Sequence, residues 1–392
     1  MKNKALSYLY CIAVSTILVS VVFLTTPVTE HNRGFDSDGR FYAAMADNDL
    51  FCSGMTNAAP WCYRVLTPGL AGTLPWSTLD NFRFIAFASS VSSLFILYLL
   101  LEKLGFARNT RLFGLMLYAG VFWTLKFSFY SPAYIDHMTQ MFLLLILFLT
   151  VSRRYLLLIP VLTIASLQKE SLAVYSLFAV AHLSGNINGA QSRTRIAAWS
   201  AAIILPPAAA LLLIRQFIPA DAPFDFFMIH NQAGLLLNPR FWPRLALAVF
   251  SGLGLIPFIA LLRPRSWTGF LSANREWLLL LVTAATFLLG GCDKARLFLY
   301  ALPFALVLAL CAVEDIGGRS GVSPRFVVWT GLTLILHYYM GNHLTPIGTF
   351  SDYLTKLVPT YAPDGYLQVL ARNTVLTLIW GLFSLRQGCM TR

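Results

Sequence analysis

The chain alternates between long apolar runs and short polar connections over most of its length. A bilayer core about 30 Å thick needs about 20 apolar residues per helix. The apolar runs lie at 5–25, 82–101, 112–130, 137–152, 155–168, 171–183, 196–217, 245–262, 276–290, 297–313, 326–341 and 373–386. The pattern predicts an all-α polytopic membrane protein with about 12 transmembrane helices. Several runs are short, so the expected range is about 10 to 13 helices.

Composition excludes the main soluble classes. Of the 392 residues, 57% are apolar and 12% are charged, and the mean hydropathy is +0.66. Globular domains carry roughly 25% charged residues, and a soluble domain this apolar could not cover its surface with polar groups. The net charge of +12 is spread in single and paired basic residues between apolar runs, without a basic stripe. The expected partner is therefore the lipid bilayer and not nucleic acid.

The positions of the basic residues predict the orientation. With a cytoplasmic N-terminus, the inside connections hold 16 of the 29 basic residues but only 4 of the 17 acidic ones. Cytoplasmic loops of membrane proteins are enriched in Lys and Arg. We therefore expect a multi-pass membrane protein with both termini cytoplasmic. The long polar loops at 26–80, 218–244 and 342–372 would then face the periplasm or exterior.

Two regions form one continuous membrane domain in this interpretation. Residues 1–217 would be a transmembrane module whose first outer loop, 26–80, contains short helices, and residues 218–392 would be the C-terminal transmembrane region. The run at 5–25 is expected to be a retained anchor, with a cleaved signal peptide as the alternative. Pro206 and Pro207 are expected to kink the run at 196–217.

Two cysteines share the first outer loop. Cys52 and Cys62 lie ten positions apart, and an oxidising compartment would permit a disulfide between them. Two unpaired thiols are the alternative. No CxxC motif or His cluster accompanies them, so a metal site is not expected there.

The first outer loop also carries paired acids. Residues 35–42 read FDSDGRFY, and in an extended segment Asp36 and Asp38 would face the same way. One carboxylate could act as a general base, and the pair could hold a divalent cation such as Mg²⁺ or Mn²⁺. The alternative is a solvated turn before a short helix from Tyr42 to Asn48.

Basic residues follow at places that suit a phosphate. Residues 60–69 read PWCYRVLTPG, in which the fork of Arg64 would fit a phosphate at headgroup level or anchor the chain at the interface. Residues 290–296 read GGCDKAR, and Arg296 would point outward there, with a tight turn as the alternative.

Other ionisable residues stand at the ends of apolar runs. Asp136 and His137 follow a bend, and Lys169 and Glu170 stand between two apolar runs. Ionisable residues at membrane depth are costly, so each is a functional candidate by default. The alternative is a Lys–Glu pair or a helix cap.

The order of these motifs resembles the GT-C class of polytopic glycosyltransferases. Asp-Gly-x-x-Tyr after the first run is followed by Tyr-Arg-x-Leu-x-Pro, Tyr-x-Asp, Lys-Glu and Gly-x-Asp-x-x-Arg. The sequence looks most like bacterial members of that class, and this resemblance implies a place in the bacterial inner (plasma) membrane with the active site facing the periplasm or exterior. It is more loosely similar to protein mannosyltransferases and lipid A aminoarabinose transferases. The resemblance covers 26–183 well and 290–303 in part.

The resemblance implies a chemistry and a set of residues. Such enzymes move a sugar from a polyprenyl-phosphate donor to an extracytoplasmic acceptor, which is a glycan, a lipid or a protein, and a first-loop Asp is the base. The implied catalytic acids are Asp38 and Asp36. The implied donor-phosphate residues are Arg64, Arg296 and Lys169. The implied substrate-binding residues are Tyr42, Tyr63, Asp136, His137, Glu170 and Asp293. Many relatives have adjacent acids, whereas Ser37 separates them here, so the choice of base stays open.

Other functions compete with this one. About twelve spans also suit a transporter or a flippase for lipid-linked sugars, although the two halves show no repeat or matching broken helices. A polysaccharide polymerase or a membrane acyltransferase is a third class. Walker, Rossmann, HExxH and GxSxG motifs are missing from the sequence, which argues against an ATP-driven pump and familiar hydrolases.

Overall fold

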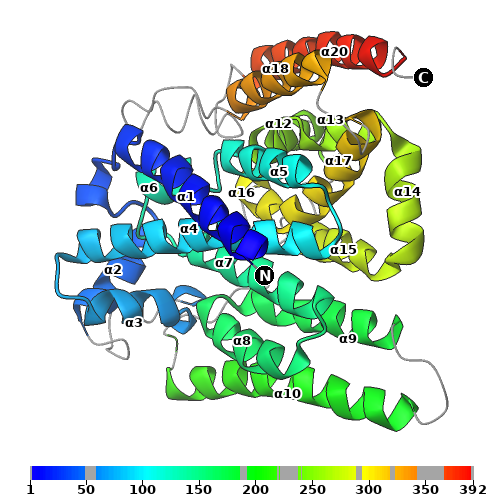
Figure 1. Ribbon diagram of the computed structural model, residues 1–392. Helices are drawn as coiled ribbons and strands as arrows, with labels where there is room; N and C mark the ends of the chain where they lie inside the picture. Colours follow the sequence, from blue (N-terminus) through cyan, green and yellow to red (C-terminus); the bar gives the residue numbers. More distant parts are fainter. Residues whose placement is uncertain are drawn as a thin grey trace. The chain divides into compact units, whose positions relative to one another are not determined.

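The protein is helical throughout the part that the structure describes. The computed structural model describes residues 2–48, 59–185, 192–218, 220, 237–239, 241–287, 294–317, 323–341 and 366–389. Among these residues all regular elements are α-helices or short 3-10 helices, and none is a strand (Figure 1). The all-α prediction is therefore confirmed for the described part of the chain.

The chain divides into two compact units. The first comprises Met1–Lys103 and Phe127–Phe226, and the second comprises Leu104–Lys126 and Phe227–Arg392. The sequence suggested a division near residue 217, and the units also place a segment of the N-terminal half, 104–126, with the C-terminal half. Each unit is described by itself below.

The first unit contains the polar loop and the helices around it. Its α-helices are α1 (Lys2–Thr25), α2 (Gly39–Asp47), α3 (Leu66–Thr73), α4 (Thr78–Lys103), α7 (Asp136–Val151), α8 (Tyr155–Gln168), α9 (Tyr175–Gly185) and α10 (Ser192–Phe217), with α6 (Lys126–Tyr130) at the join between units. Its 3-10 helices are η1 (His31–Gly34), η3 (Trp61–Tyr63) and η4 (Glu170–Val174). The first outer loop thus contains short helices, as expected.

Packing in the first unit centres on α7, which contacts α4 on one side and α8 on another (Figure 1). α1 packs on α4, and α10 packs on α8. Ser77 begins α4, because its hydroxyl accepts from the Asp80 amide at 3.2 Å and donates to the Asp80 carboxylate at 2.7 Å. The first of these bonds satisfies one orphan backbone amide of the first helical turn, and the second holds the Ser77 hydroxyl in place.

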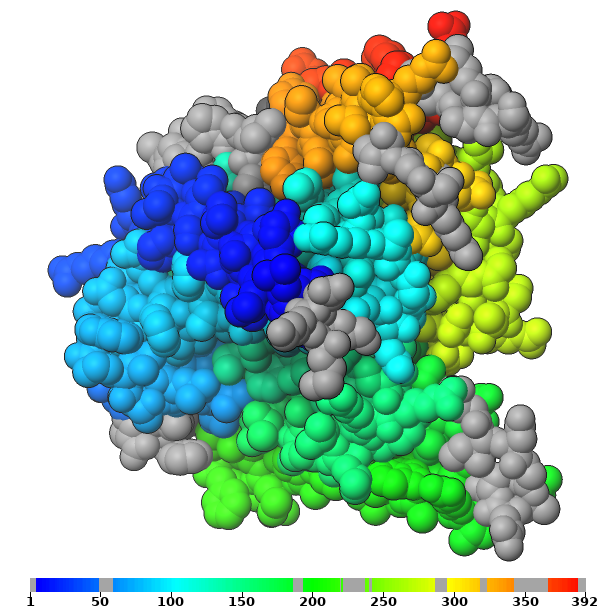
Figure 2. Space-filling model, in the orientation of Figure 1, coloured from blue at the N-terminus to red at the C-terminus, as the bar shows by residue number. Residues whose placement is uncertain are grey.

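Among the described residues, three helices are long and apolar enough to cross a membrane, and all three belong to the first unit. They are Ala5–Thr25 in α1, Thr78–Lys103 in α4 and Arg193–Phe217 in α10, while α7 and α8 are shorter apolar helices. In Figure 2, α1 (dark blue) lies on the outside of its unit. Its Leu6, Leu9 and Leu24 are exposed. Exposed apolar surface on this scale needs a nonpolar surrounding, which is the environment a bilayer provides.

The second unit is built on α17. Its α-helices are α5 (Arg108–Gly120), α12 (Phe241–Leu253), α13 (Ile256–Leu261), α14 (Pro264–Ala273), α15 (Leu278–Phe287), α16 (Lys294–Leu297), α17 (Leu302–Gly317), α18 (Pro324–Met340) and α20 (Tyr366–Cys389). Its 3-10 helices are η5 (Arg275–Trp277) and η6 (Phe298–Tyr300). α17 contacts α5, α13 and α14, and α18 contacts α5 and α20.

The apolar run at 112–130 is not one helix. α5 ends at Gly120, and α6 begins only at Lys126. The Thr124 hydroxyl donates to the carbonyls of Tyr118 and Val121 at 2.7 and 2.8 Å. These bonds satisfy carbonyls that a continuing helix would have used, so a single continuous span was a wrong prediction here.

The run at 245–262 is also broken, between α12 and α13. Gly254 has a φ of +56°, and an added Cβ would lie 2.3 Å from Nδ1 of His337. That nitrogen accepts from the Leu255 amide at 3.1 Å, and Nε2 of His337 donates to the Leu117 carbonyl at 2.8 Å. One buried imidazole therefore ties the break to α18 and to α5.

The other runs differ from expectation mainly at their ends. The runs at 171–183 and 276–290 open with the 3-10 turns η4 and η5, and α20 begins at Tyr366, inside the loop expected at 342–372. α10 contains Pro206 and Pro207 within a single helical segment. Most of the expected outer loops at 218–244 and 342–372 lies outside the described residues.

Gly254→Ala should destabilise the protein by about 2–4 kcal/mol, because a side chain there has an unfavourable backbone conformation and overlaps His337. Thermal unfolding of purified protein in detergent would measure the change. Gly269→Ala is the matched control, since its added Cβ meets nothing within 4 Å inside α14. It should be neutral or stabilising by up to about 1 kcal/mol. Equal effects of the two changes would contradict the role assigned to the break.

Candidate functional site

The paired acids of the first loop lie on a turn and not on an extended segment. Ser37 has a φ of +41°, and the Gly39 amide donates to the Asp36 carbonyl at 2.8 Å. The turn sends the two carboxylates into different surroundings: Asp36 is 2% exposed, whereas Asp38 is half-buried at the start of α2. The expectation that both face the same way is therefore wrong.

Asp36 binds the bend that precedes α7. The Ser131 hydroxyl lies 3.2 Å from each carboxylate oxygen of Asp36. A Cβ added to Gly39 would lie 3.2 Å from that of Ala133, so the start of α2 packs closely on the same bend. This contact brings the first loop beside the Tyr-x-Asp motif, which is far away in sequence.

Tyr42 lies one helical turn after Asp38 and is buried. Its hydroxyl accepts a hydrogen bond from Nη1 of Arg64 at 3.1 Å. Burial raises the pKa of Tyr42 to about 12, against the opposing charge of Arg64 and with a contribution from Asp38. Tyr42 is therefore a neutral phenol near pH 7, placed between Asp38 and Arg64.

Arg64 and Glu170 form a two-pronged ion pair across 106 positions of sequence. Nε and Nη2 of Arg64 donate to Oε2 and Oε1 of Glu170 at 3.1 and 2.6 Å. The side chains are 12% and 31% exposed. The geometry is the planar fork that arginine makes with carboxylates.

The pair keeps both members charged. Burial acts to raise the pKa of Glu170, but the charge and hydrogen bonds of Arg64 outweigh it and hold that pKa below its ordinary value. Burial likewise acts against the charged guanidinium, yet Glu170 and Tyr42 hold the pKa of Arg64 well above its ordinary value. The contacts with Glu170 and Tyr42 use three N–H donors of Arg64, and a guanidinium has further donors on both Nη atoms.

A second ion pair is formed by Lys169, the residue immediately before Glu170. Nζ of Lys169 is 3.0 Å from Oδ1 of Asp136, and the side chains are 11% and 7% exposed. Lys169 is extended at the end of α8, and Asp136 begins α7. Adjacent residues 169 and 170 thus reach two different segments, the start of α7 and the first outer loop.

Thr67 and Gln168 were not among the candidates. The Thr67 hydroxyl donates to Oε1 of Gln168 at 2.7 Å, and Nε2 of Gln168 donates to the Ile135 carbonyl at 2.9 Å. Gln168 therefore joins α3, α8 and the start of α7 beneath the two ion pairs. Both residues lie in or next to motifs named above. Thr67 lies within Tyr-Arg-x-Leu-x-Pro, and Gln168 immediately precedes Lys-Glu. Their polarity amid apolar neighbours was the available signal.

The remaining candidates have separate placements. Nε2 of His137 lies 3.2 Å from the Pro132 carbonyl, so this buried ring holds the bend before α7. The ring of Tyr63 lies 5.5 Å from the guanidinium carbon of Arg215. Arg296 is half-buried in α16 of the second unit.

Two expectations fall outside the described residues. Cys62 is buried in η3, but its expected partner Cys52 is not described. Asp293 is not described either. The disulfide and the substrate-binding role of Asp293 stay predictions.

Three carboxylates of this cluster already have protein partners. Asp136 and Glu170 each bind a cationic side chain, and Asp36 is turned toward a hydroxyl. Among the described residues no group of three or more His, Cys, Asp or Glu side chains could hold a metal ion. A divalent cation would have to compete with Lys169 and Arg64 for Asp136 and Glu170.

We call the set Asp36, Asp38, Tyr42, Arg64, Asp136, Lys169 and Glu170 the ion-pair cluster. It combines the half-buried carboxylate of Asp38 with two cations, Arg64 and Lys169, each of which is bound by another carboxylate. Such an arrangement can accept a proton at Asp38 and stabilise negative charge near Arg64 and Lys169.

Asp136→Asn should lower the free energy of unfolding by about 3–5 kcal/mol, because it leaves the buried Lys169 ammonium without this carboxylate. The double variant Asp136→Asn/Lys169→Gln should recover part of that loss. A double-mutant cycle by thermal unfolding in detergent would give the coupling, expected above about 1 kcal/mol. Additive effects would show that the two side chains do not stabilise one another. Asp315→Asn, in an exposed pair with Arg263, is the control and should cost less than about 1 kcal/mol.

We compared the chain with known protein families, curated proteins and solved structures. The chain matches no family model, no curated protein and no solved structure. The resemblance to GT-C enzymes therefore rests on the sequence motifs, and the function of the ion-pair cluster has to be argued from its own residues.

Proposed function

We propose that this protein is an integral membrane glycosyltransferase that moves a sugar from a polyprenyl-phosphate donor to an extracytoplasmic acceptor. The observation that carries the proposal is the meeting of four dispersed motifs in the ion-pair cluster. Asp38 and Arg64 come from the first loop, Asp136 from the start of α7, and Lys169 and Glu170 from the end of α8. Independent helix caps would not require such convergence, whereas a reaction site does.

The proposed topology would place the ion-pair cluster on the side of the membrane where this reaction takes place. About 12 helices would cross the inner membrane, with both termini cytoplasmic and the ion-pair cluster on the periplasmic side. The starts of α4 and α7 and the end of α8 would then lie at the outer interface. A lipid-linked donor presents its phosphate at that depth, and this favours a site among helix ends and loops.

The proposed reaction needs a base and a means to stabilise a leaving phosphate. Asp38 takes the proton of the acceptor hydroxyl as its oxygen forms a bond to the anomeric carbon of the donor sugar. The bond between that carbon and the phosphate oxygen breaks, and its electron pair leaves with the polyprenyl phosphate. Because the anomeric carbon gains positive character and the phosphate gains negative charge, an anionic base and nearby cations serve opposite ends of one transition state.

Glu170 is a positioning residue in this scheme. It holds the guanidinium of Arg64 through Nε and Nη2, so the donors that remain on the Nη atoms have a fixed direction. A phosphate bound there would add to the pair and need not displace it. Lys169, held by Asp136, supplies the second cation.

A transporter or flippase is the second candidate, and one observation favours it. The Lys169–Asp136 pair is buried between the ends of two apolar helices, and buried ionisable pairs also occur in proton-coupled transporters. The half-buried Asp38 beside a neutral Tyr42 is better explained by a reaction with a hydroxyl acceptor than by transport alone.

Asp38→Asn should reduce sugar transfer by about 10²–10⁴-fold and leave donor binding largely unchanged, because it removes the base while it preserves size. The measurement is transfer from a polyprenyl-phosphate sugar by purified protein, beside a binding assay for the donor. Asp36→Asn is the matched control, since this acid is buried against Ser131. If Asp36 is the base, the two phenotypes exchange. Full activity in both variants and in the double variant would exclude the proposed mechanism.

Single cysteines placed at position 38 and at the exposed position 40 should react with a membrane-impermeant thiol reagent from the periplasmic side, and one at position 2 only after the membrane is opened. The physical reason is the concentration of basic residues in the other set of loops. Labelling would be carried out on intact cells and on inverted vesicles. Reaction of position 38 only in inverted vesicles would overturn both the orientation and the proposed site.

A further inference from the structure

A second polar site lies at the opposite end of the α7–α8 hairpin. The ion-pair cluster contains the start of α7 and the residues after α8, whereas this site surrounds the connection from α7 to α8. α7 has 16 residues, so the two ends are about 24 Å apart. The site is a cavity of about 520 Å³ lined by Arg153, Arg154, Tyr155, Leu156, Leu157, Leu183, Arg195 and Trp199.

The cavity joins cationic and apolar walls. Its eight lining residues include three arginines and no acid, and the other five are aromatic or aliphatic. The rings of Tyr155 and Trp199 lie 5.9 Å apart, and Leu183 is buried beside them. A volume of this size falls within the range of roughly 300–1,000 Å³ that is usual for ligand pockets.

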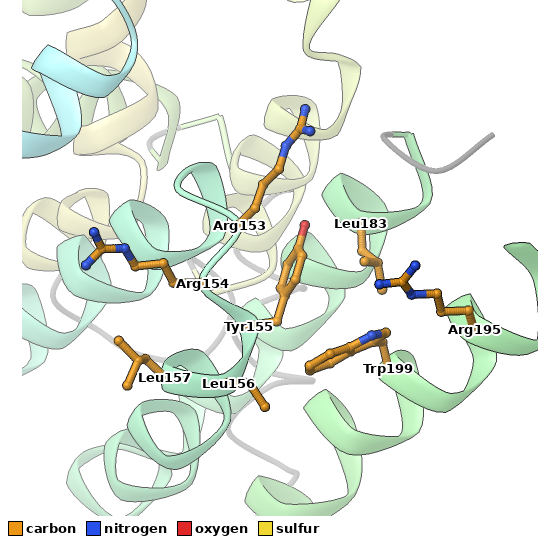
Figure 3. A pocket seen from close by; sticks show the side chains of 8 residues that line it. All are labelled: Arg153, Arg154, Tyr155, Leu156, Leu157, Leu183, Arg195 and Trp199. Carbon is orange, nitrogen blue, oxygen red and sulfur yellow. The ribbon is translucent and has the colours of Figure 1, made fainter.

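Figure 3 shows how the side chains are arranged. Arg153 and Arg154 extend in different directions from the connection between α7 and α8, and Arg195 extends from α10 past Leu183. The ring of Trp199 lies below Tyr155 in this view. The positive charges therefore surround an aromatic and aliphatic interior and do not meet at one point, as they would in a tight site for a single small anion.

One wall continues onto the outer surface of the unit. Leu156 and Leu157 are 76% and 53% exposed, and they belong to the first turn of the apolar helix α8. A soluble phosphate compound would contact only the arginines and leave these leucines unused. A lipid would use both features, with its anionic headgroup spread across the arginine-lined cavity and its acyl chains along α8.

We propose that this cavity binds the headgroup of an acidic glycerophospholipid of the cytoplasmic leaflet. The side of the membrane rests on the proposed orientation, while the binding of the lipid rests on the cavity itself. Basic pockets between membrane helices on the cytoplasmic side are suited to anionic headgroups. A bound lipid would bridge the α7–α8 connection and the start of α10, and so fix the end of the hairpin whose other end carries the ion-pair cluster.

The test is lipid binding to the purified full-length protein in neutral detergent, measured by native mass spectrometry and by the shift in thermal unfolding. The probes are phosphatidylglycerol, phosphatidylcholine, a polyprenyl phosphate and inorganic phosphate. Arg195→Gln is compared with Arg193→Gln, an exposed arginine of α10 that does not line the cavity. Neither variant touches the ion-pair cluster, and the readout needs no transferase activity, so failure here is distinct from failure of the proposed function.

We expect phosphatidylglycerol to bind more tightly than phosphatidylcholine, and Arg195→Gln to weaken it about fivefold while Arg193→Gln leaves it unchanged. Equal weakening by the two variants would show a general surface charge effect and overturn the proposal. Equal binding of phosphatidylcholine, or full displacement by millimolar inorganic phosphate, would do the same. Preference for polyprenyl phosphate that depends on Arg195 would assign the cavity to a different lipid and also overturn it.

Discussion

The ion pair between Arg64 and Glu170 is the contact on which the arrangement of the first unit depends. It joins the polar loop after α1 to the end of α8 across 106 positions, with two hydrogen bonds of 3.1 and 2.6 Å. The described residues of the loop between α1 and α4 form short helices. The bond from Arg64 to Tyr42 lies within this loop, and the bond to Glu170 joins the loop to the residue that follows α8 by two. Together with the contact of Asp36 with Ser131, this salt bridge holds the loop that carries Asp38.

The cost of buried charge explains the neighbouring contacts. A charge removed from water is tolerated only when it is paired and hydrogen-bonded. Lys169 satisfies this requirement through Asp136, and Gln168 fills the space between them and α3 with neutral hydrogen bonds. The cluster is consequently rigid for a structural reason, and the same rigidity would fix the direction of its cations toward a bound phosphate.

In the second unit a neutral imidazole, that of His337, supplies hydrogen bonds to buried polar groups. The two nitrogens of His337 satisfy the Leu255 amide and the Leu117 carbonyl where apolar runs are interrupted. A helix break in an apolar environment leaves backbone groups without partners unless another side chain supplies them. The helix break at Gly254 and the position of His337 thus depend on one another, since a Cβ at Gly254 would occupy the place of the imidazole ring.

The sequence by itself determined the helical class, the positions of most helices and the candidates of the ion-pair cluster. Periodicity and length are local properties, so α4, α8 and α10 end close to the predicted limits. Whether Asp36 and Asp38 face together was decided by the turn at Ser37, and which cation each acid binds was decided by packing of segments distant in sequence. The breaks in the runs at 112–130 and 245–262 likewise depend on partners that an apolar pattern does not encode, Thr124 within a turn and His337 from another helix. The pattern of apolar and polar residues along the chain indicates which residues avoid water. Which polar groups meet is decided only by the tertiary structure, because a buried charge or amide binds whichever partner the packing brings within hydrogen-bond distance.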